Sequence, residues 1–102
     1  MGLIKMNKEI KLPCLYEKLT QLQRKQVREE YIEQQDGKCM HCGGDLDKDP
    51  PQQIIDTEIN LMLFPPNFLN YPIHLQHDHD SGLTEGSVHA RCNAILWQYH
   101  GR

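Results

Sequence analysis

The chain has 102 residues and a mass of 11.9 kDa, which fits one domain and excludes folds as large as the barrel of eight strand–helix units. Its net charge of −3 does not have the sign expected of a protein that is basic over its whole surface and binds nucleic acid. No apolar run approaches the ~20 residues of a membrane helix, and no apolar secretory segment follows Met1. We therefore expect a cytoplasmic protein that does not contact membranes.

The charge is unevenly distributed along the chain. Residues 1–34 carry seven basic and five acidic side chains, a sum of +2, whereas residues 35–102 carry four basic and nine acidic ones, a sum of −5. Arg24, Lys25 and Arg28 lie together in the basic part, where a solvated helix face is the simpler interpretation and DNA contact the alternative. With so few positive charges, phosphate binding by this segment alone should be weak and sensitive to salt.

The first third of the chain predicts a polar arm over residues 1–14 and helical structure over residues 15–36. Apolar side chains recur there at helical spacing, beginning with Leu15 and Leu19. Thr20 and Gln23 have the spacing of a capping box, so we expect one helix to end and another to begin near Thr20. Gly37 suits the C-terminal end of the second helix.

Two short cysteine motifs predict a structural zinc site. Cys39 and Cys42 form a Cys-x-x-Cys pair that two glycines follow, and these glycines allow a turn that places both sulfurs on one side. The second half-site is best assigned to His89 and Cys92, which lie three residues apart at the start of a predicted helix. Three thiolates and one imidazole form a closed structural set, which leaves no coordination position for catalysis.

Other assignments of these residues are open at this point. Cys39 and Cys42 could be free thiols or a redox pair, although a redox pair normally lies within a strand–helix–strand unit that does not precede them here. His41 is a rival ligand, but it lies inside the turn of the knuckle. Cys14 is interpreted as a plain thiol.

Residues 45–75 form a long connector between the two halves of the zinc site. Its prolines forbid a long helix, yet its apolar side chains are too many for a free linker. We expect an ordered loop that packs on the core and contains one short strand or turn. The remaining segment, 73–101, predicts a strand over 73–77, a turn over 78–82, a second strand over 83–88 and a helix from His89 that stops at Gly101.

A run of histidines and aspartates occupies the predicted turn. Alternation would direct His77 and His79 to one face, and Asp78 and Asp80 to the other. A polar hairpin turn is the plain interpretation. The alternative is a site for Mg²⁺ or Mn²⁺, whose oxygen ligands are available here, with a neutral histidine beside it that activates water.

Taken together, these residues resemble the recombination endonuclease VII branch of the HNH, or ββα-metal, nucleases, which is typical of phages. The family's core pattern is Asp-His-Asp-His-x-Thr-Gly-x-x-Arg-Gly-x-x-Cys-x-x-Cys-Asn, and residues 76–93 align with it without a gap as QHDHDSGLTEGSVHARCN. Residues 28–39 also resemble the family's helix before its knuckle. The resemblance implies an α+β fold over residues 1–102, a small single domain with an N-terminal helix, a zinc knuckle and a ββα-metal motif over 73–101.

The resemblance also implies roles for individual residues. His77 takes the position of the general base and His79 that of a supporting histidine. Asn93 takes the position of a ligand of the catalytic cation, and Gln76 stands where the family has its ligand aspartate. Asp78 is a further candidate ligand of that cation. The candidate DNA contacts are Arg24, Lys25, Arg28 and Arg91.

Three positions depart from the family pattern. His89 replaces a zinc cysteine, which zinc tolerates, and Glu85 replaces an arginine that could contact phosphate. Gln76 is the most serious departure, because a neutral amide oxygen binds Mg²⁺ less well than a carboxylate does. Asp78 or His74 could compensate, or a softer ion such as Mn²⁺ or Ni²⁺ could be preferred.

The resemblance therefore predicts a metal-dependent DNA endonuclease that nicks duplex DNA or cleaves branched DNA. Cleavage of branched DNA would require a homodimer, for which the sequence shows no clear dimer helix. The alternative is a zinc-stabilised module, weakly active or inactive, that binds nucleic acid or a protein. Gln76, Glu85 and the acidic charge of residues 35–102 favour that alternative.

Overall fold

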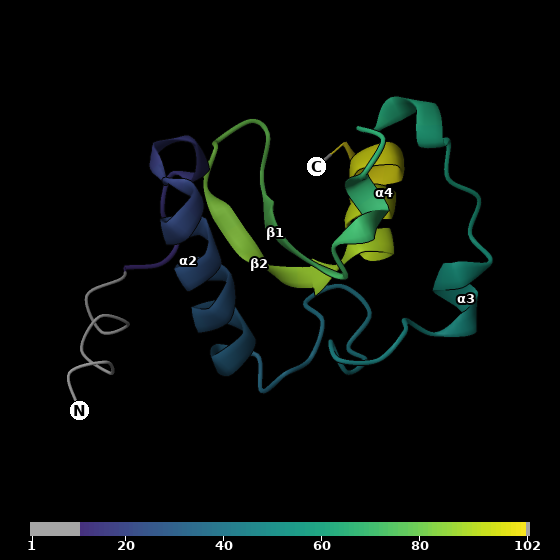
Figure 1. The fold of residues 1–102 in the computed structure, drawn as a ribbon, viewed down its shortest axis with the longest axis horizontal. Coiled ribbons are helices and arrows are strands. Elements are labelled where there is room, and N and C mark those ends of the chain that lie inside the picture. Colours follow the sequence, from purple (N-terminus) through teal and green to yellow (C-terminus); the bar gives the residue numbers. More distant parts are fainter. Residues whose placement is uncertain (1–10, 102) are drawn as a thin grey trace.

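A computed structural model describes residues 11–101 of the chain, so residues 1–10 of the predicted arm and Arg102 lie outside the described residues. The fold is a small α+β unit built around one two-stranded antiparallel sheet, as predicted. Figure 1 shows the two longer helices on opposite sides of the β-hairpin. None of the described helices is long and apolar enough to cross a membrane.

The principal elements follow the predicted order. They are the helices α2 (Gln21–Gln34), α3 (Gln52–Ile55) and α4 (Ala90–His100), and the strands β1 (Ile73–His77) and β2 (Thr84–His89). Three single turns of 3-10 helix accompany them: η1 (Tyr16–Lys18), η2 (Leu61–Leu63) and η3 (Phe68–Asn70). The predicted helical segment 15–36 is thus one short turn followed by α2.

Local signals in the sequence fix both ends of α2. The Thr20 hydroxyl accepts a hydrogen bond from the Gln23 N–H at 3.1 Å, and the Gln23 side-chain oxygen accepts one from the Thr20 N–H at 2.9 Å. This reciprocal pair satisfies two amides that a helix start leaves without intrahelical partners, and it confirms the predicted capping box. Asp36 and Gly37 adopt positive φ angles of 59° and 74° just past the helix, which ends it.

The ββα segment matches its prediction closely. β1 and β2 pair antiparallel, with Ile73 opposite His89 and Gln76 opposite Gly86. The register then shifts, because His77 pairs with Thr84 and one residue of β2 is left as a bulge. α4 begins directly after β2, and Gly101 ends it in the left-handed conformation at φ 70°.

The core consists of two clusters on either side of the sheet. Val27 and Tyr31 of α2 pack against Leu75 of β1, and the Tyr31 hydroxyl contacts the Thr84 hydroxyl at 2.9 Å. The second cluster lies between the knuckle and α4 and consists of Cys39, Leu46, Val88, Cys92 and Leu96. The hairpin is therefore held from both faces, and its strands cannot shift independently of either helix.

The connector differs from its prediction. It contains three short helical turns (α3, η2 and η3) and, among its described residues, no strand. Its prolines prevent a longer helix and deprive a strand of ladder donors. As expected, it is ordered and packs on the core: the Asn60 N–H donates to the Gln98 side chain of α4 at 2.9 Å, and Ile54 contacts the knuckle cluster.

Candidate zinc knuckle and active-site cleft

The four predicted zinc ligands come together at one end of the sheet. The ligand atoms of Cys39, Cys42, His89 and Cys92 all lie within 4.8 Å of one another. Zinc bonds of about 2.3 Å to sulfur and 2.0–2.1 Å to nitrogen in a tetrahedron place such atoms about 3.5–3.8 Å apart. The measured separations of His89 Nδ1 from the sulfurs of Cys42 and Cys92, 3.4 and 3.8 Å, fit this geometry.

The turn of the knuckle aims its backbone amides at the sulfurs. The N–H groups of His41 and Cys42 point to Cys39 Sγ at 3.4 and 3.5 Å, and the Gly44 N–H points to Cys42 Sγ at 3.4 Å. Gly43 has a φ of 79°, which a residue with a β-carbon rarely adopts. These amide dipoles stabilise negative charge on the sulfurs, as a thiolate bound to a cation requires.

The pKa of Cys39 lies far below the ordinary value for a thiol. The largest cause is a hydrogen bond from the Cys92 side chain, and amides of the knuckle turn lower the pKa further while burial opposes the shift. Cys39 is thus predisposed to be a thiolate.

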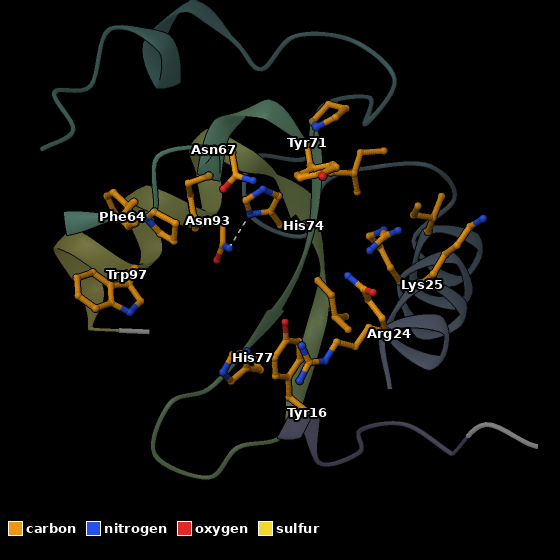
Figure 2. Close-up of a pocket in the computed structure, with 18 of the residues that line it drawn as sticks. Tyr16, Arg24, Lys25, Phe64, Asn67, Tyr71, His74, His77, Asn93 and Trp97 are labelled. Atoms are coloured by element: carbon orange, nitrogen blue, oxygen red, sulfur yellow. Dashed lines mark hydrogen bonds between the residues drawn. The ribbon is translucent and has the colours of Figure 1, made fainter. Parts of the chain in front are cut away.

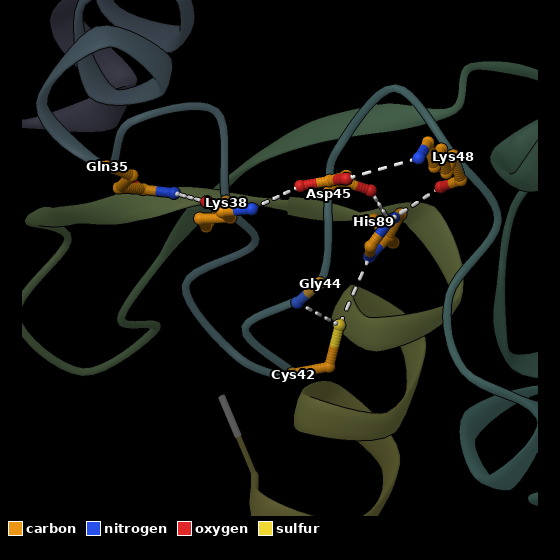
Figure 3. A network of polar contacts seen from close by, with 7 residues as sticks. All are labelled: Gln35, Lys38, Cys42, Gly44, Asp45, Lys48 and His89. Atoms are coloured by element: carbon orange, nitrogen blue, oxygen red, sulfur yellow. Dashed lines mark hydrogen bonds and ion pairs between the residues drawn. The ribbon is translucent and has the colours of Figure 1, made fainter.

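His89 is oriented by the connector. Its Nε2 lies 2.9 Å from the carbonyl oxygens of both Asp45 and Lys48, as Figure 3 shows. Because carbonyls only accept hydrogen bonds, Nε2 carries the proton and Nδ1 keeps its lone pair, which faces the sulfurs. This arrangement of a ligand histidine held by a carbonyl is typical of zinc sites, so the group can hold a structural zinc ion.

Neither the rival ligand His41 nor the remaining thiol, Cys14, belongs to this group. Cys14 lies away from the group and contacts the Thr84 hydroxyl with its sulfur at 3.8 Å. His41 faces the ring of His100, with 6.3 Å between ring centroids.

A cleft of about 1120 Å³ runs along β1. Its walls come from α2, from the connector and from α4, and β1 contributes its floor. Figure 2 shows two groups of polar side chains in it: His77 beside Tyr16 and Arg24, and His74 beside Asn93. Three of the predicted catalytic residues, His77, His79 and Asn93, therefore share one cleft.

His77 is held by aromatic neighbours. Its ring stacks on Tyr16 at 4.0 Å between centroids, and the ring of His79 lies 4.7 Å away, on the same side as the alternation predicted. Arg24 in turn covers the Tyr16 ring at 4.1 Å. The pKa of His77 is lowered, mainly by burial and then by His79 and Arg24, so the imidazole is neutral near pH 7 and can accept a proton.

His74 and Asn93 form the second polar group. The Asn93 side-chain NH2 group (Nδ2) donates a hydrogen bond to His74 Nδ1 at 3.0 Å, and Phe68 packs edge-on against the His74 ring at 4.6 Å. Burial lowers the pKa of His74, although hydrogen bonds to the backbone of Phe68 and Tyr71 oppose the shift. This hydrogen bond uses the Nδ1 lone pair of the imidazole, so Asn93 Oδ1 is the atom of this pair that is suited to bind a cation.

Sequence reasoning considered His74 only as a substitute for Gln76. The signal that places it beside Asn93 is the strand register: Ile73 pairs with His89, so the start of β1 lies next to the first turn of α4. That register depends on the bulge in β2 opposite Gln76 and His77, which the sequence does not reveal.

Gln76 and Asp78 lie elsewhere. Gln76 is 1% exposed, donates a hydrogen bond from its side chain to the His77 carbonyl at 3.0 Å and is not among the described residues that line the cleft. The Asp78 carboxylate accepts hydrogen bonds from the amides of Asp80 and Ser81 at 2.7 and 3.2 Å and thereby shapes the hairpin turn. Neither of these two predicted ligands is among the described residues that line the cleft with Asn93.

Of the four predicted DNA contacts, three line the cleft and one does not. Arg24, Lys25 and Arg28 of α2 all line the cleft. Arg91 points to the connector instead, where it donates to the Ile55 carbonyl at 3.1 Å. The basic helix face is therefore directed at the histidines, which composition alone did not show.

Comparison of the chain with family models, with curated proteins and with solved structures gives no match.

Proposed function

We propose that this protein is a divalent-cation-dependent DNA endonuclease that hydrolyses phosphodiester bonds. The observation that carries the proposal is the cleft itself, in which a neutral histidine, His77, shares one space with Asn93 and with the cationic face of α2. The resemblance of residues 76–93 to the HNH core supports the same assignment. The zinc group at the junction of β2 and α4 would keep the ββα unit rigid.

His77 would accept the proton of the water that attacks phosphorus. Its stacking on Tyr16 fixes the plane of the imidazole, and its lowered pKa keeps the ring unprotonated at neutral pH. Arg24, Lys25 and Arg28 would hold the phosphates of the bound strand. Asn93 Oδ1 would hold the divalent cation, and His74 Nδ1 would join it by giving up the hydrogen bond that it accepts from Asn93. The cation would stabilise the charge that develops on the phosphate oxygens.

The donor set indicates which cation suits the site. A histidine nitrogen and an amide oxygen are both neutral, whereas Mg²⁺ prefers carboxylates and water. Mn²⁺ and Ni²⁺ accept imidazole readily, so we expect the highest activity with one of these ions and weaker activity with Mg²⁺. Gln76, the ligand predicted from the family pattern, would then stabilise the backbone of β1 through its hydrogen bond to His77 and would not bind the cation.

A supercoiled-plasmid assay tests the proposal. Wild type, His77→Ala and a matched control, His41→Ala, are compared with Mg²⁺, Mn²⁺ or Ni²⁺ and without added cation. We expect nicking or linearisation that depends on the cation and falls about 10²–10⁴-fold in His77→Ala, the range for loss of a general base. His41→Ala, which changes a histidine outside the cleft, should retain activity. Equal cleavage by His77→Ala would exclude the mechanism.

A zinc-stabilised binding module is the second candidate. One observation favours it: among the described residues that line the cleft, Glu29 of α2 is the only carboxylate. This candidate predicts that the zinc-loaded protein binds DNA or a protein partner and cleaves no substrate with any of the three cations. Activity gained by Gln76→Asp would then indicate a nuclease that has lost its ligand.

The proposal also includes the setting of the activity. A nuclease of this kind would act on DNA in the cytoplasm, the host cytoplasm if a phage encodes it. Cleavage of both strands at a branch requires two active sites, so we expect a homodimer if branched DNA is the substrate. Sedimentation of the zinc-loaded protein with and without a four-way junction would separate this case from nicking by a monomer.

A further inference from the structure

The connector contributes an aromatic wall to the cleft, and we infer that this wall binds an unpaired nucleobase of the DNA strand. The inference deepens the proposed function, on which it rests for the identity of the polymer. It predicts that the protein prefers single-stranded or branched DNA to a continuous duplex. We define the aromatic wall as Phe64 and Phe68 of the connector together with Trp97 of α4.

The aromatic wall is open to the cleft. Phe64 lies between its two partners, 4.6 Å from Phe68 and 5.6 Å from Trp97 between ring centroids. The Trp97 indole is 40% exposed although it sits on the helix that carries the buried core residues of the knuckle cluster. A tryptophan that only packed would bury most of this area, because its large apolar surface is costly to leave in water.

The opposite wall has complementary chemistry. Arg24, Lys25 and Arg28 line the side formed by α2, and the two walls face each other across the floor of β1 (Figure 2). A nucleotide has a flat apolar base on one side and an anionic phosphate on the other, so it matches a cleft with one aromatic and one cationic wall. The cleft of about 1120 Å³ exceeds the range of roughly 300–1,000 Å³ typical of small-ligand sites, which suits a segment of a polymer.

The position of the aromatic wall relative to the histidines determines which nucleotide along the strand would place its base there. The ring of His79 lies 6.1 Å from Trp97 and 4.7 Å from His77, so the three side chains form a continuous row. A base on Trp97 would therefore belong to a nucleotide close to the phosphate that His77 serves. In a continuous duplex both faces of that base are covered by neighbouring bases, and the aromatic wall can be used only where the base is unstacked.

Trp97 is the only tryptophan of the chain, which gives a direct readout. Zinc-loaded protein without added divalent cation is titrated with a dT oligonucleotide and with an abasic oligonucleotide of equal length and charge. We expect the indole fluorescence to be quenched by dT and not by the abasic strand, and the affinity for dT to be higher. Base–aromatic stacking of this kind changes affinity roughly 5- to 150-fold on removal of the ring.

Three variants make the result specific, with affinity measured by anisotropy of a labelled oligonucleotide. Trp97→Ala and Phe64→Ala should lose the preference for dT over the abasic strand, and Trp97→Phe should keep part of it. Met62→Ala is the matched control, because Met62 belongs to the same connector, is 91% exposed and does not line the cleft. Circular dichroism and zinc content check that the variants are folded.

Equal affinity of wild type for the two strands would overturn the inference, as would an equal loss of both affinities in Trp97→Ala. Neither result depends on cleavage, so a nuclease without a base site and a base site without nuclease activity give different outcomes.

Discussion

The β-hairpin carries two polar sites of opposite character. At the knuckle, the ligand atoms of four residues lie within 4.8 Å of one another, and three of those residues are buried. In the cleft, His74, His77 and Asn93 are only half-buried, and the contact between His74 and Asn93 is made by two neutral groups. The knuckle is a closed set that the chain completes by itself, whereas the cleft leaves room for further ligands.

This difference shows how a small domain can place a metal group that stabilises the fold and a cleft that can bind ligands in different parts of one hairpin. The closed site needs nothing from outside except the metal, so it can stabilise the fold at all times. The open site offers few ligands of its own, and a cation there would take the others from water and from substrate phosphate. A cleft of this kind should bind its cation more tightly when DNA is present.

The largest effect should come from the closed site. Structural zinc in small domains contributes about 10–16 kcal/mol at pH 7, which is comparable to the entire ~5–15 kcal/mol stability of a typical domain. We expect Cys92→Ser, or treatment with a strong chelator, to abolish the cooperative thermal transition seen by circular dichroism. Cys14→Ser is the control, since this half-buried thiol lies outside the zinc group. A folded, zinc-free Cys92→Ser protein would show that the knuckle is not needed for the fold.

The open site should respond in a different measurement. If His74 is a ligand of the cation, His74→Ala should weaken Mn²⁺ binding at least tenfold, as followed by electron paramagnetic resonance or calorimetry, and should leave zinc content unchanged. His79→Ala, which removes an exposed histidine of the same cleft, should change Mn²⁺ affinity little. Unchanged Mn²⁺ binding in His74→Ala would show that His74 is not a ligand of the cation.

A smaller effect should appear in the pH dependence of cleavage. If His77 is the general base, it acts only when neutral, and the cleavage rate should rise with pH through its pKa. Burial, His79 and Arg24 lower that pKa in the free protein, which places the midpoint of the kcat/KM profile below the ordinary value of 6.5. In His79→Gln one source of positive charge is gone, and the midpoint should move to higher pH. A profile that does not move would show that His79 does not influence the base.

The sequence predicted those parts of the molecule that local signals determine. The capping box at Thr20, the β1 strand, and the stop of α4 at Gly101 depend on neighbours in the chain, and the zinc ligands on short, recognisable spacings. The contact between His74 and Asn93 depends instead on the register of the hairpin, and a bulge between Gln76 and His77 changes that register. The connector was least predictable, because its helical turns are too short to show a helical period in the sequence, and one of them is fastened to α4 by the bond from Asn60 to Gln98.

The same connector has an unusual property as a loop. It begins where His89 meets the carbonyls of Asp45 and Lys48, and it returns where the Ala90 amide donates to the Pro72 carbonyl at 2.9 Å. Both ends are thus fastened to two consecutive residues at the junction of β2 and α4. The entropy of closing such a loop grows only slowly with its length. The length of this segment could therefore change in evolution at little cost to the fold, as long as the two fastened ends are kept.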